Sequence, residues 1–260
     1  MNLIVCIKQV PDTTEIKIDP DTNTLIREGV ESIINPFDLY ALEEAIRLKE
    51  QEGGKVTVLS MGPPQVESAL RESISMGADE IILLTDKRFA GADTWATSLT
   101  LAEAIKKIGN YNLILFGQQA IDGDTAQVGP GVATFLKLPQ TCFVKKIEEI
   151  RQDSIIVQRL MEDGYDRIKM PLPSVITVVK EINIPRLPSL RGKRNAKKAP
   201  LTIWNSDDLG LEENIIGLNG SPTQVINIFS PEIRKEGEKH ELPSEELVEI
   251  LYNKLKELGK

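Results

Sequence analysis

Residues 112–131, NLILFGQQAIDGDTAQVGPG, place a short apolar run directly before a turn of small residues. Asn112 to Phe116 is a candidate strand, because short and wholly apolar runs are typical of strands covered on both faces. Gly117 to Gly131 follows as a long turn, and the helical pattern VATFLKL comes next at 132–138. Strand, turn and helix in this order form the repeating unit of a parallel α/β sheet.

The same unit repeats toward the N-terminus. Three more apolar runs are strand candidates: Leu3 to Val10, Lys55 to Met61 and Glu80 to Thr85. Three helical patterns alternate with them: Pro36 to Gln51 with Asn35 as N-cap, Pro64 to Met76, and Thr94 to Ile108 behind Asp93. We therefore predict an α/β fold, with a mostly parallel, Rossmann-like sheet that carries helices on both faces.

Other segments are expected to add to this sheet. Glu15 to Ile18 and Thr24 to Arg27 flank a turn-rich DPDTN and predict a small hairpin before the first helix. After Pro139, four strand-like pieces predict antiparallel additions at a sheet edge: CFVKKIEEI, SIIVQRLM, YDRIKM and PSVITVVKEI. We predict one domain over residues 1–200, including a basic segment at 185–198, and a C-terminal arm over 201–260.

The predicted arm ends in an amphipathic helix. Ser244 to Leu258 places five aliphatic side chains on one face: Leu247, Ile250, Leu251, Leu255 and Leu258. An isolated helix of this length is marginal in water, so we expect the arm to pack on a partner subunit.

Composition excludes several classes of protein. The 260 residues are 41% apolar, enough for one sizeable core, but no apolar run approaches the roughly 20 residues of a membrane span. The N-terminus has no leader pattern, so we expect a cytoplasmic protein without membrane insertion. Acidic residues outnumber basic ones by 39 to 31, which argues against nucleic-acid binding. Two distant cysteines and a single histidine, His240, predict no metal site and no histidine-based catalysis.

The turn after the 112–116 strand is the strongest candidate site, because ligands of open parallel sheets bind beyond the carboxyl ends of the strands. Its small residues let a ligand approach the backbone, and N–H groups at the start of the next helix suit a pyrophosphate. The turn contains neither the Walker motif nor G-x-G-x-x-G. Asp122 and Asp124 would repel phosphate, so we assign them to ribose hydroxyls, helix capping or backbone bonds. The alternative is a glycine-rich lead-in to the helix that binds nothing.

Other loops are weaker candidates. Cys6 to Val10 ends the first strand, NPFD (Asn35 to Asp38) starts a helix, and SMGPP (Ser60 to Pro64) joins a strand to a helix. An ordinary N-cap explains NPFD, and an ordinary turn explains SMGPP. Thr94 and Thr97 follow Asp93 at a helix start, where capping is the commoner explanation and phosphate binding the alternative.

A basic segment, PRLPSLRGKRNAKK at 185–198, departs from the acidic average. It has no aromatic residue for base stacking, which disfavours nucleic acid. A leucine among prolines and basic residues better suits docking to a protein, with Leu190 entering an apolar pocket and the charges steering the encounter. A merely solvated loop is the alternative.

Taken in order, CIKQVPD, NPFDLYALEEAIRLKE, VLSMGP, MGAD, GQQAIDGDTAQVGP and PRLPSLRGKRNAKK closely resemble the beta subunit of electron-transfer flavoproteins over nearly the whole chain. The resemblance implies a heterodimer with an FAD-carrying alpha subunit, a nucleotide site in beta, and a loop that recognises acyl-CoA dehydrogenases. Together with the helix-start threonines, it suggests these cofactor-binding residues: Cys6, Asn35, Pro36, Phe37, Asp38, Met61, Thr94, Thr97, Ala120, Ile121, Asp122, Gly123, Asp124, Thr125, Ala126, Gln127, Val128, Gly129, Pro130 and Gly131. It suggests these partner-docking residues: Leu190, Arg191, Lys193 and Arg194.

The resemblance is to the electron-bifurcating members of that family. Their beta subunit holds a complete FAD that takes a hydride from NADH; one electron then goes to ferredoxin or flavodoxin, and the other reaches the dehydrogenase through the alpha-subunit FAD. Small residues from Gly123 to Gly129 agree with room for a flavin, and no catalytic side chain is implied. The alternatives are a non-bifurcating carrier with a structural AMP, and an ATP-using or nucleotide-sensing protein of similar architecture.

Overall fold

The computed structural model describes residues 1–12, 32–227, 237 and 239–259. The chain divides into two compact units, Met1–Ile226 and Asn227–Lys260. The hairpin predicted within residues 15–27 lies outside the described residues.

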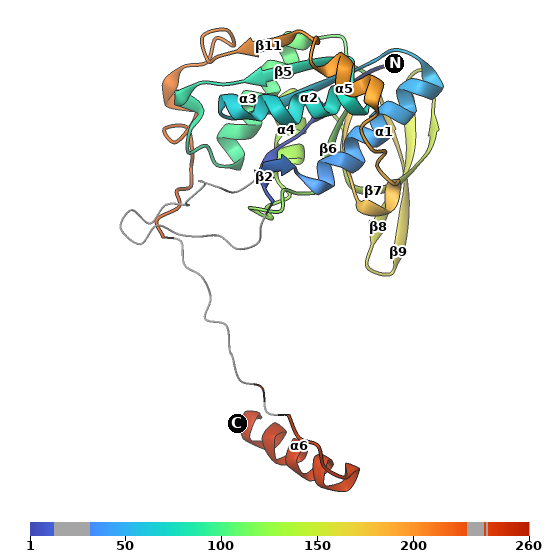
Figure 1. Cartoon of the computed structure of the whole chain (residues 1–260), viewed down its shortest axis with the longest axis vertical. Helices are drawn as coiled ribbons and strands as arrows, with labels where there is room; N and C mark the ends of the chain where they lie inside the picture. Colours follow the sequence, from blue (N-terminus) through green and yellow to red (C-terminus); the bar gives the residue numbers. More distant parts are fainter. Residues whose placement is uncertain (13–31, 228–236, 238, 260) are drawn as a thin grey trace. The chain divides into compact units, whose positions relative to one another are not determined.

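A nine-stranded sheet runs through the described part of the first unit (Figure 1). Its strands lie in the order β11–β5–β4–β1–β6–β10–β7–β8–β9. The seven strands from β11 to β7 are parallel, and β8 and β9 add antiparallel pairs at the β7 edge. The strand bounds are β1 Asn2–Cys6, β4 Lys55–Met61, β5 Glu80–Leu84, β6 Leu113–Gly117, β7 Gln140–Ile150, β8 Ser154–Met161, β9 Gly164–Pro171, β10 Ser174–Val178 and β11 Leu201–Trp204.

Helices cover both faces of the parallel part. The helix bounds are α1 Pro36–Glu52, α2 Glu67–Met76, α3 Thr94–Ile108, α4 Val128–Leu136 and α5 Leu190–Ala196. Helices α1, α2 and α5 share one apolar core with alternate strand residues such as Val5, whereas α3 and α4 share a second core with residues such as Ile4. Both faces of the strands are therefore buried, as their continuous apolar sequences predict. The predicted fold class is confirmed.

Local signals locate the helices well. Helix α3 begins and ends where predicted, and Asp93 caps it by accepting hydrogen bonds from the N–H groups of Trp95 and Ala96. Helix α1 begins at Pro36, whose fixed φ suits the first helical position. The helix predicted over Pro64 to Met76 is split, because a short 3₁₀ turn, η1 (Pro64–Val66), precedes α2.

The first strand is shorter than predicted. β1 ends at Cys6, and Gln9–Pro11 forms β2, which pairs antiparallel with β3 (Ser32–Ile34) in a separate two-stranded sheet. The physical reason is at Lys8, whose N–H donates to the carboxylate of Asp38 instead of continuing the sheet ladder.

Two strands lie where the sequence pattern did not place them. Ser174–Val178 was predicted at an antiparallel edge, but β10 is parallel and lies between β6 and β7. All five of its residues are buried, which requires cover on both faces. Leu201–Trp204, predicted as part of the arm, forms β11, the parallel edge strand beside β5.

Two helices also differ from expectation. Helix α4 begins at Val128, four residues before the predicted VATFLKL, so that Gly129, Pro130 and Gly131 lie inside its first turns. A proline is tolerated there because the first-turn N–H groups have no partner within the helix. The basic segment contains helix α5, whose N-cap is Ser189.

The second unit contains the predicted amphipathic helix, α6 (Ser244–Leu258). Within this unit Val248, Leu251, Tyr252 and Leu255 are exposed. Packing of the arm on a partner subunit stays a prediction. No helix in the described ranges has the length and apolar character needed to cross a bilayer.

Candidate functional site

The loops that follow β1 and β6 share the carboxyl edge of the sheet. The two strands are adjacent and parallel, with Cys6 opposite Phe116. In the sheet, β4 and β5 lie on one side of β1, whereas β6, the next strand of this sheet along the chain, lies on the other side. Open α/β sheets bind ligands at such a reversal of strand order. The turn that the sequence singled out lies at this reversal.

Asp38 joins these two loops from the first turn of α1. Its carboxylate accepts hydrogen bonds from the N–H of Lys8 at 2.7 Å and from the N–H of Gly117 at 3.2 Å. The contact is close, because a Cβ on Gly117 would lie 2.5 Å from the Asp38 carboxylate. Asp38 thus holds the chain after β1 at a set distance from the end of β6.

Burial controls ionisation at this junction. It raises the pKa of Asp38 from 3.8 to about 7, against the opposing hydrogen bonds from Lys8, Asn35 and Gly117. Burial also raises the pKa of the Cys6 thiol well above its usual range, and the neighbouring Asp38 adds to this effect. Cys6 is therefore a neutral core residue rather than an activated nucleophile.

Asn35 ties the site loop to the start of α1. Its side-chain Nδ2 donates to the carbonyl of Gln119 at 2.8 Å, and its Oδ1 accepts from the N–H of Ile121 at 3.2 Å. The side chain is fully buried. Asn35 occupies the N-cap position of α1, as predicted, but its side chain makes no capping bond there, because these two bonds direct the amide into the loop.

Side-chain pairs hold the acidic residues of the loop. The Lys8 ammonium bonds both Asp122 oxygens, at 2.7 and 2.6 Å, and Gln119 Nε2 donates to Asp124 at 2.8 Å. Helix capping and backbone bonds, two of the roles predicted for these aspartates, are therefore replaced by side-chain partners. Lys8 also compensates the Asp122 charge next to the place where a phosphate is expected.

The backbone after Asp124 has the geometry of an anion-binding turn. Asp124 and Ala126 have left-handed φ angles of 47° and 54°, and Gln127 returns to the right-handed region. Alternation of these conformations turns successive N–H groups toward one point. Among the described residues, no oxygen accepts from the N–H groups of Thr125 to Gly129. The turn and the start of α4 therefore offer a row of donors that suits a diphosphate.

Glycines let α4 lie directly against its neighbours. A Cβ on Gly129 would lie 2.7 Å from Thr177 Cγ2 of β10, and one on Gly131 would lie 2.4 Å from the Ser98 hydroxyl of α3. A Cβ on Gly123, by contrast, would have no atom within 4 Å, so the surroundings of this residue are open. The helix start is thus fixed by close packing, while the exposed part of the turn has room beside it.

The other predicted cofactor residues lie on elements around this turn. Met61 ends β4 next to β1, and Pro36 and Phe37 begin α1. Thr94 and Thr97 lie in the first turns of α3, which contacts α4 through the Ser98 hydroxyl and the Val128 carbonyl at 3.3 Å. Capping by Asp93 is confirmed there, and phosphate binding by the threonines stays a prediction.

The predicted docking residues form a separate surface. Leu190 begins α5 and is 88% exposed, and Arg191, Lys193 and Arg194 are exposed beside it. Helix α5 rests on α2, where the Ser189 N–H donates to the Ser75 carbonyl at 3.2 Å. A shallow hollow follows this seam, away from the β1–β6 loops.

The sequence did not predict the roles of two residues that shape the site. Lys8 belonged to a candidate loop, but its bond to Asp122 joins positions 114 residues apart. Its signal is that it alone carries a charge within the apolar run from Leu3 to Val10. Gln119 gives no local signal, because an amide in a loop is common. Within the described ranges, no cluster of histidine, cysteine and acidic residues could hold a metal ion.

Comparison with known proteins adds independent information. The family model described as electron transfer flavoprotein domain matches residues 22–209. The chain is 55% identical over 239 residues to an electron transfer flavoprotein subunit beta of Thermoanaerobacterium thermosaccharolyticum, covering 92% of this chain and 91% of that protein. It is 54% identical over 239 residues to the caffeyl-CoA reductase-Etf complex subunit CarD of Acetobacterium woodii, with the same coverage. It is 46% identical over 243 residues to protein FixA of Sinorhizobium fredii, covering 91% of this chain and 85% of that protein.

Proposed function

The chain belongs to the electron transfer flavoprotein family, as a beta subunit, and on this premise we propose that it binds FAD at the β1–β6 site and takes part in electron bifurcation. Membership of the family implies electron transfer together with an alpha subunit. The identity of the nucleotide, the donor and the acceptors is the proposed part.

The row of backbone donors from Thr125 to Gly129 carries the proposal for the nucleotide. Donors on a turn with alternating handedness, followed by a helix start, suit the two phosphates of a dinucleotide. Lys8 lowers the repulsion from Asp122, and a Cβ on Gly123 would meet no atom within 4 Å, so the turn is open on that side. The residues present therefore fit FAD.

When bound, FAD would supply the redox chemistry: oxidation of NADH by hydride transfer, with electrons going to ferredoxin or flavodoxin and, through the alpha-subunit FAD, to an acyl-CoA dehydrogenase. The chain's own residues position the cofactor. Thr125 to Gly129 donate to phosphate, Asn35 fixes the loop, and Asp38 sets the spacing of the two loops. No side chain of this subunit is required as a general acid or base.

The proposed dehydrogenase partner docks on the surface of α5. The exposed Leu190 supplies an apolar anchor, and Arg191, Lys193 and Arg194 steer a negatively charged partner toward it. The name of the Acetobacterium woodii relative, a subunit of a caffeyl-CoA reductase-Etf complex, supports a partner that acts on a CoA ester. The exposed apolar residues of α6 support a further proposal, that the C-terminal arm packs on the alpha subunit.

The nucleotides released by the heterodimer test the proposal. The purified complex with the alpha subunit is denatured by heat, and the released nucleotides are separated and quantified. Two FAD per heterodimer are expected. One FAD with one AMP would instead identify a non-bifurcating carrier, and ATP without flavin would identify a nucleotide-sensing protein. Reduction of both flavins during a titration with NADH, followed by absorbance, is the second expected result.

A further inference from the structure

A hollow with a volume of about 570 Å³ lies at the seam between α2 and α5. Sites for small molecules commonly have volumes of about 300–1,000 Å³. Residues 74–79, at the end of α2 and in the loop after it, line one side of the hollow. The α5 side contributes three polar side chains, those of Arg191, Asn195 and Lys198. We call this space the α2–α5 hollow.

The three polar side chains form a stripe. Arg191, Asn195 and Lys198 are spaced at i, i+4 and i+7, which brings side chains to one face of a helix. Helix α5 ends at Ala196, and the Lys198 N–H continues the turn by donating to the Asn195 carbonyl at 2.9 Å. Among the described residues, none of the three side chains has a hydrogen-bond or ion-pair partner. The stripe therefore presents guanidinium, amide and ammonium donors that are free to bind a ligand.

Close packing fixes α5 on the protein. Gly192 lies against α2, and a Cβ on it would be 2.1 Å from the Ser75 carbonyl oxygen. At the other end of α5, the Arg71 guanidinium donates to the carbonyls of Ala196 at 2.5 Å and Ala199 at 3.3 Å. The hollow is therefore formed before any ligand binds, which lowers the entropy cost of binding.

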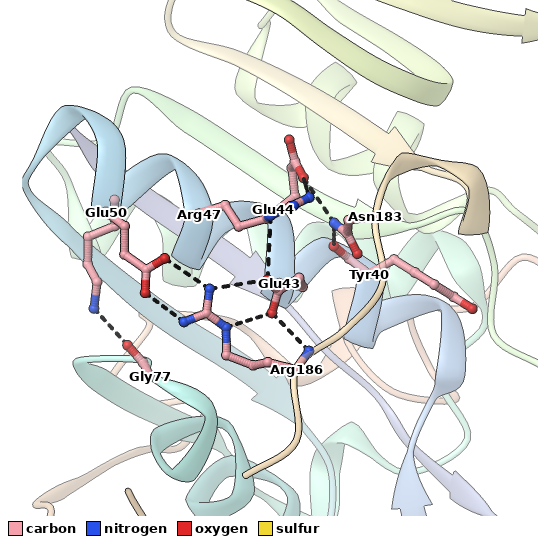
Figure 2. A network of polar contacts seen from close by, with 9 residues as sticks. Tyr40, Glu43, Glu44, Arg47, Glu50, Gly77, Asn183 and Arg186 are labelled. Carbon is pink, nitrogen blue, oxygen red and sulfur yellow. Dashed lines mark hydrogen bonds and ion pairs between the residues drawn. The ribbon is translucent and has the colours of Figure 1, made fainter. Parts of the chain in front are cut away.

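The acceptors on the α2 side of the hollow already have donors. The Ser75 carbonyl accepts from the Ser189 N–H at 3.2 Å, and the Gly77 carbonyl accepts from the Lys49 ammonium at 2.7 Å (Figure 2). Among the described residues that line the hollow, Asp79 is the only acidic one, and Lys49 also pairs with it at 3.0 Å. The free donors of α5 are therefore not needed to cap the end of α2.

The charge around the hollow is positive, although the whole chain carries a net charge of −8. Earlier in the same segment, Arg186 is neutralised by bonds to Glu43 and Glu50 (Figure 2). In the part of the chain that the structure describes, no carboxylate pairs with any of the five basic residues that follow Leu190: Arg191, Lys193, Arg194, Lys197 and Lys198. Positive charge that the protein does not neutralise therefore remains beside the hollow.

We propose that the α2–α5 hollow binds an organic anion with two phosphate groups, through Arg191, Asn195 and Lys198. A guanidinium forms paired hydrogen bonds with phosphate oxygens, and an ammonium adds a point charge. Seven residues of helix rise about 10 Å, so Arg191 and Lys198 suit an anion with two charged groups better than a single small ion. The hollow shares no lining residue with the β1–β6 loops, so the inference does not depend on which nucleotide binds there.

Apolar residues complete the site. Ile74, Met76 and Ala78 also line the hollow, and each keeps a small part of its surface exposed. A carbon group of the ligand would remove this remaining apolar surface from water. The expected ligand is therefore a diphosphate ester, and inorganic pyrophosphate is a probe for its charged part.

The test is a calorimetric titration of the full heterodimer, saturated with FAD, with inorganic pyrophosphate at low ionic strength. One binding event that depends on the hollow is expected. Arg191→Gln and Lys198→Gln should each weaken it about tenfold, because each removes a charge-assisted interaction. Both side chains are exposed and have no partner among the described residues, so both variants are expected to fold.

The same segment supplies matched controls. Arg194→Gln and Lys197→Gln remove the same two kinds of charge from exposed residues that do not line the hollow. Each is expected to weaken binding by no more than about twofold, since these charges act only through a screened field. Hydrogen–deuterium exchange gives a second measurement. Pyrophosphate is expected to slow exchange in peptides covering residues 189–199 and to leave residues 120–131 unchanged.

Several results would overturn the inference. One is the absence of pyrophosphate binding to the unmodified heterodimer. Equal weakening by all four substitutions would assign binding to the overall charge of the segment, and no weakening by any of them would place the anion elsewhere. Slower exchange at residues 120–131 alone would locate pyrophosphate in the β1–β6 site, which would also count against a site filled by FAD. Failure of the proposed function alone, with AMP released in place of the second FAD, would leave the α2–α5 hollow as inferred.

Discussion

Asn35 is the most informative residue to change, because it connects α1 to the site loop without belonging to the row of backbone donors. Asn35→Ala removes two buried hydrogen bonds, to the Gln119 carbonyl and from the Ile121 N–H. Each bond contributes about 1 kcal/mol, so their loss destabilises the observed position of the loop by about 2 kcal/mol. If cofactor binding must restore the loop position, the dissociation constant for FAD rises roughly thirtyfold.

The assay is a fluorescence titration of the FAD-depleted heterodimer with FAD. The matched control is Asn112→Ala, the same substitution at the opposite end of β6, where the Asn112 side chain accepts from the Asn2 N–H at 2.8 Å. The control is expected to lose stability without a comparable loss of FAD affinity. Equal FAD affinity in the Asn35→Ala variant and the unmodified protein would refute the reasoning, as would an equal loss in both variants.

Three further predictions concern packing, ionisation and docking. Gly129→Ala places a Cβ 2.7 Å from Thr177 and is expected to destabilise the protein by about 1–3 kcal/mol in denaturant unfolding, whereas Gly123→Ala, with nothing within 4 Å, is expected to have little effect. The pKa of Asp38 is raised from 3.8 to about 7. Between these pH values the folded protein keeps the Asp38 proton, whereas the unfolded chain releases it. The stability that protonated Asp38 gives the folded state is therefore lost as the pH rises from about 4 to about 7. Asp38→Asn is therefore expected to flatten the fall in Tm across that window, and an unchanged slope would assign the pH dependence to other groups. Leu190→Ala is expected to raise the KM for the dehydrogenase about tenfold while reduction by NADH persists, and parallel loss of both activities would contradict a docking role.

Helix positions followed from the sequence because their signals are local. Pro36 at a first helical position and Asp93 at an N-cap each act through their own neighbours, and both helices begin where predicted. A cap needs only the next few residues to form, so no knowledge of the tertiary fold is required.

The order of the strands in the sheet could not be predicted from such local signals. β10 lies between β6 and β7, and the residues that it pairs with there are 61 residues earlier in the chain for Ser174 and 35 residues earlier for Val175. Strand-like pieces that follow one another closely in sequence favour hairpins, and the prediction followed that signal. The β-branched SVITV, without a charged residue, was the competing indication of a strand covered on both faces. β11 has exposed residues at its centre and gave no apolar run to recognise.

The candidate site was predictable in place and only partly in detail. Small residues after an apolar strand located the turn at the carboxyl edge of the sheet. The bonds that shape it join distant positions, such as Asn35 with Gln119 and Lys8 with Asp122. The same residue types are common in caps and on surfaces, so only the fold shows that they meet here.

The central claim is that the turn from Ala120 to Gly131 holds the diphosphate of an FAD, and a crystal structure of the heterodimer with its alpha subunit tests it most directly. Phosphate oxygens within hydrogen-bonding distance of the N–H groups of Thr125 to Gly129, with the flavin extending past Gly123, are the predicted result. A cofactor bound elsewhere in this subunit, with those N–H groups facing other protein atoms, would contradict the account.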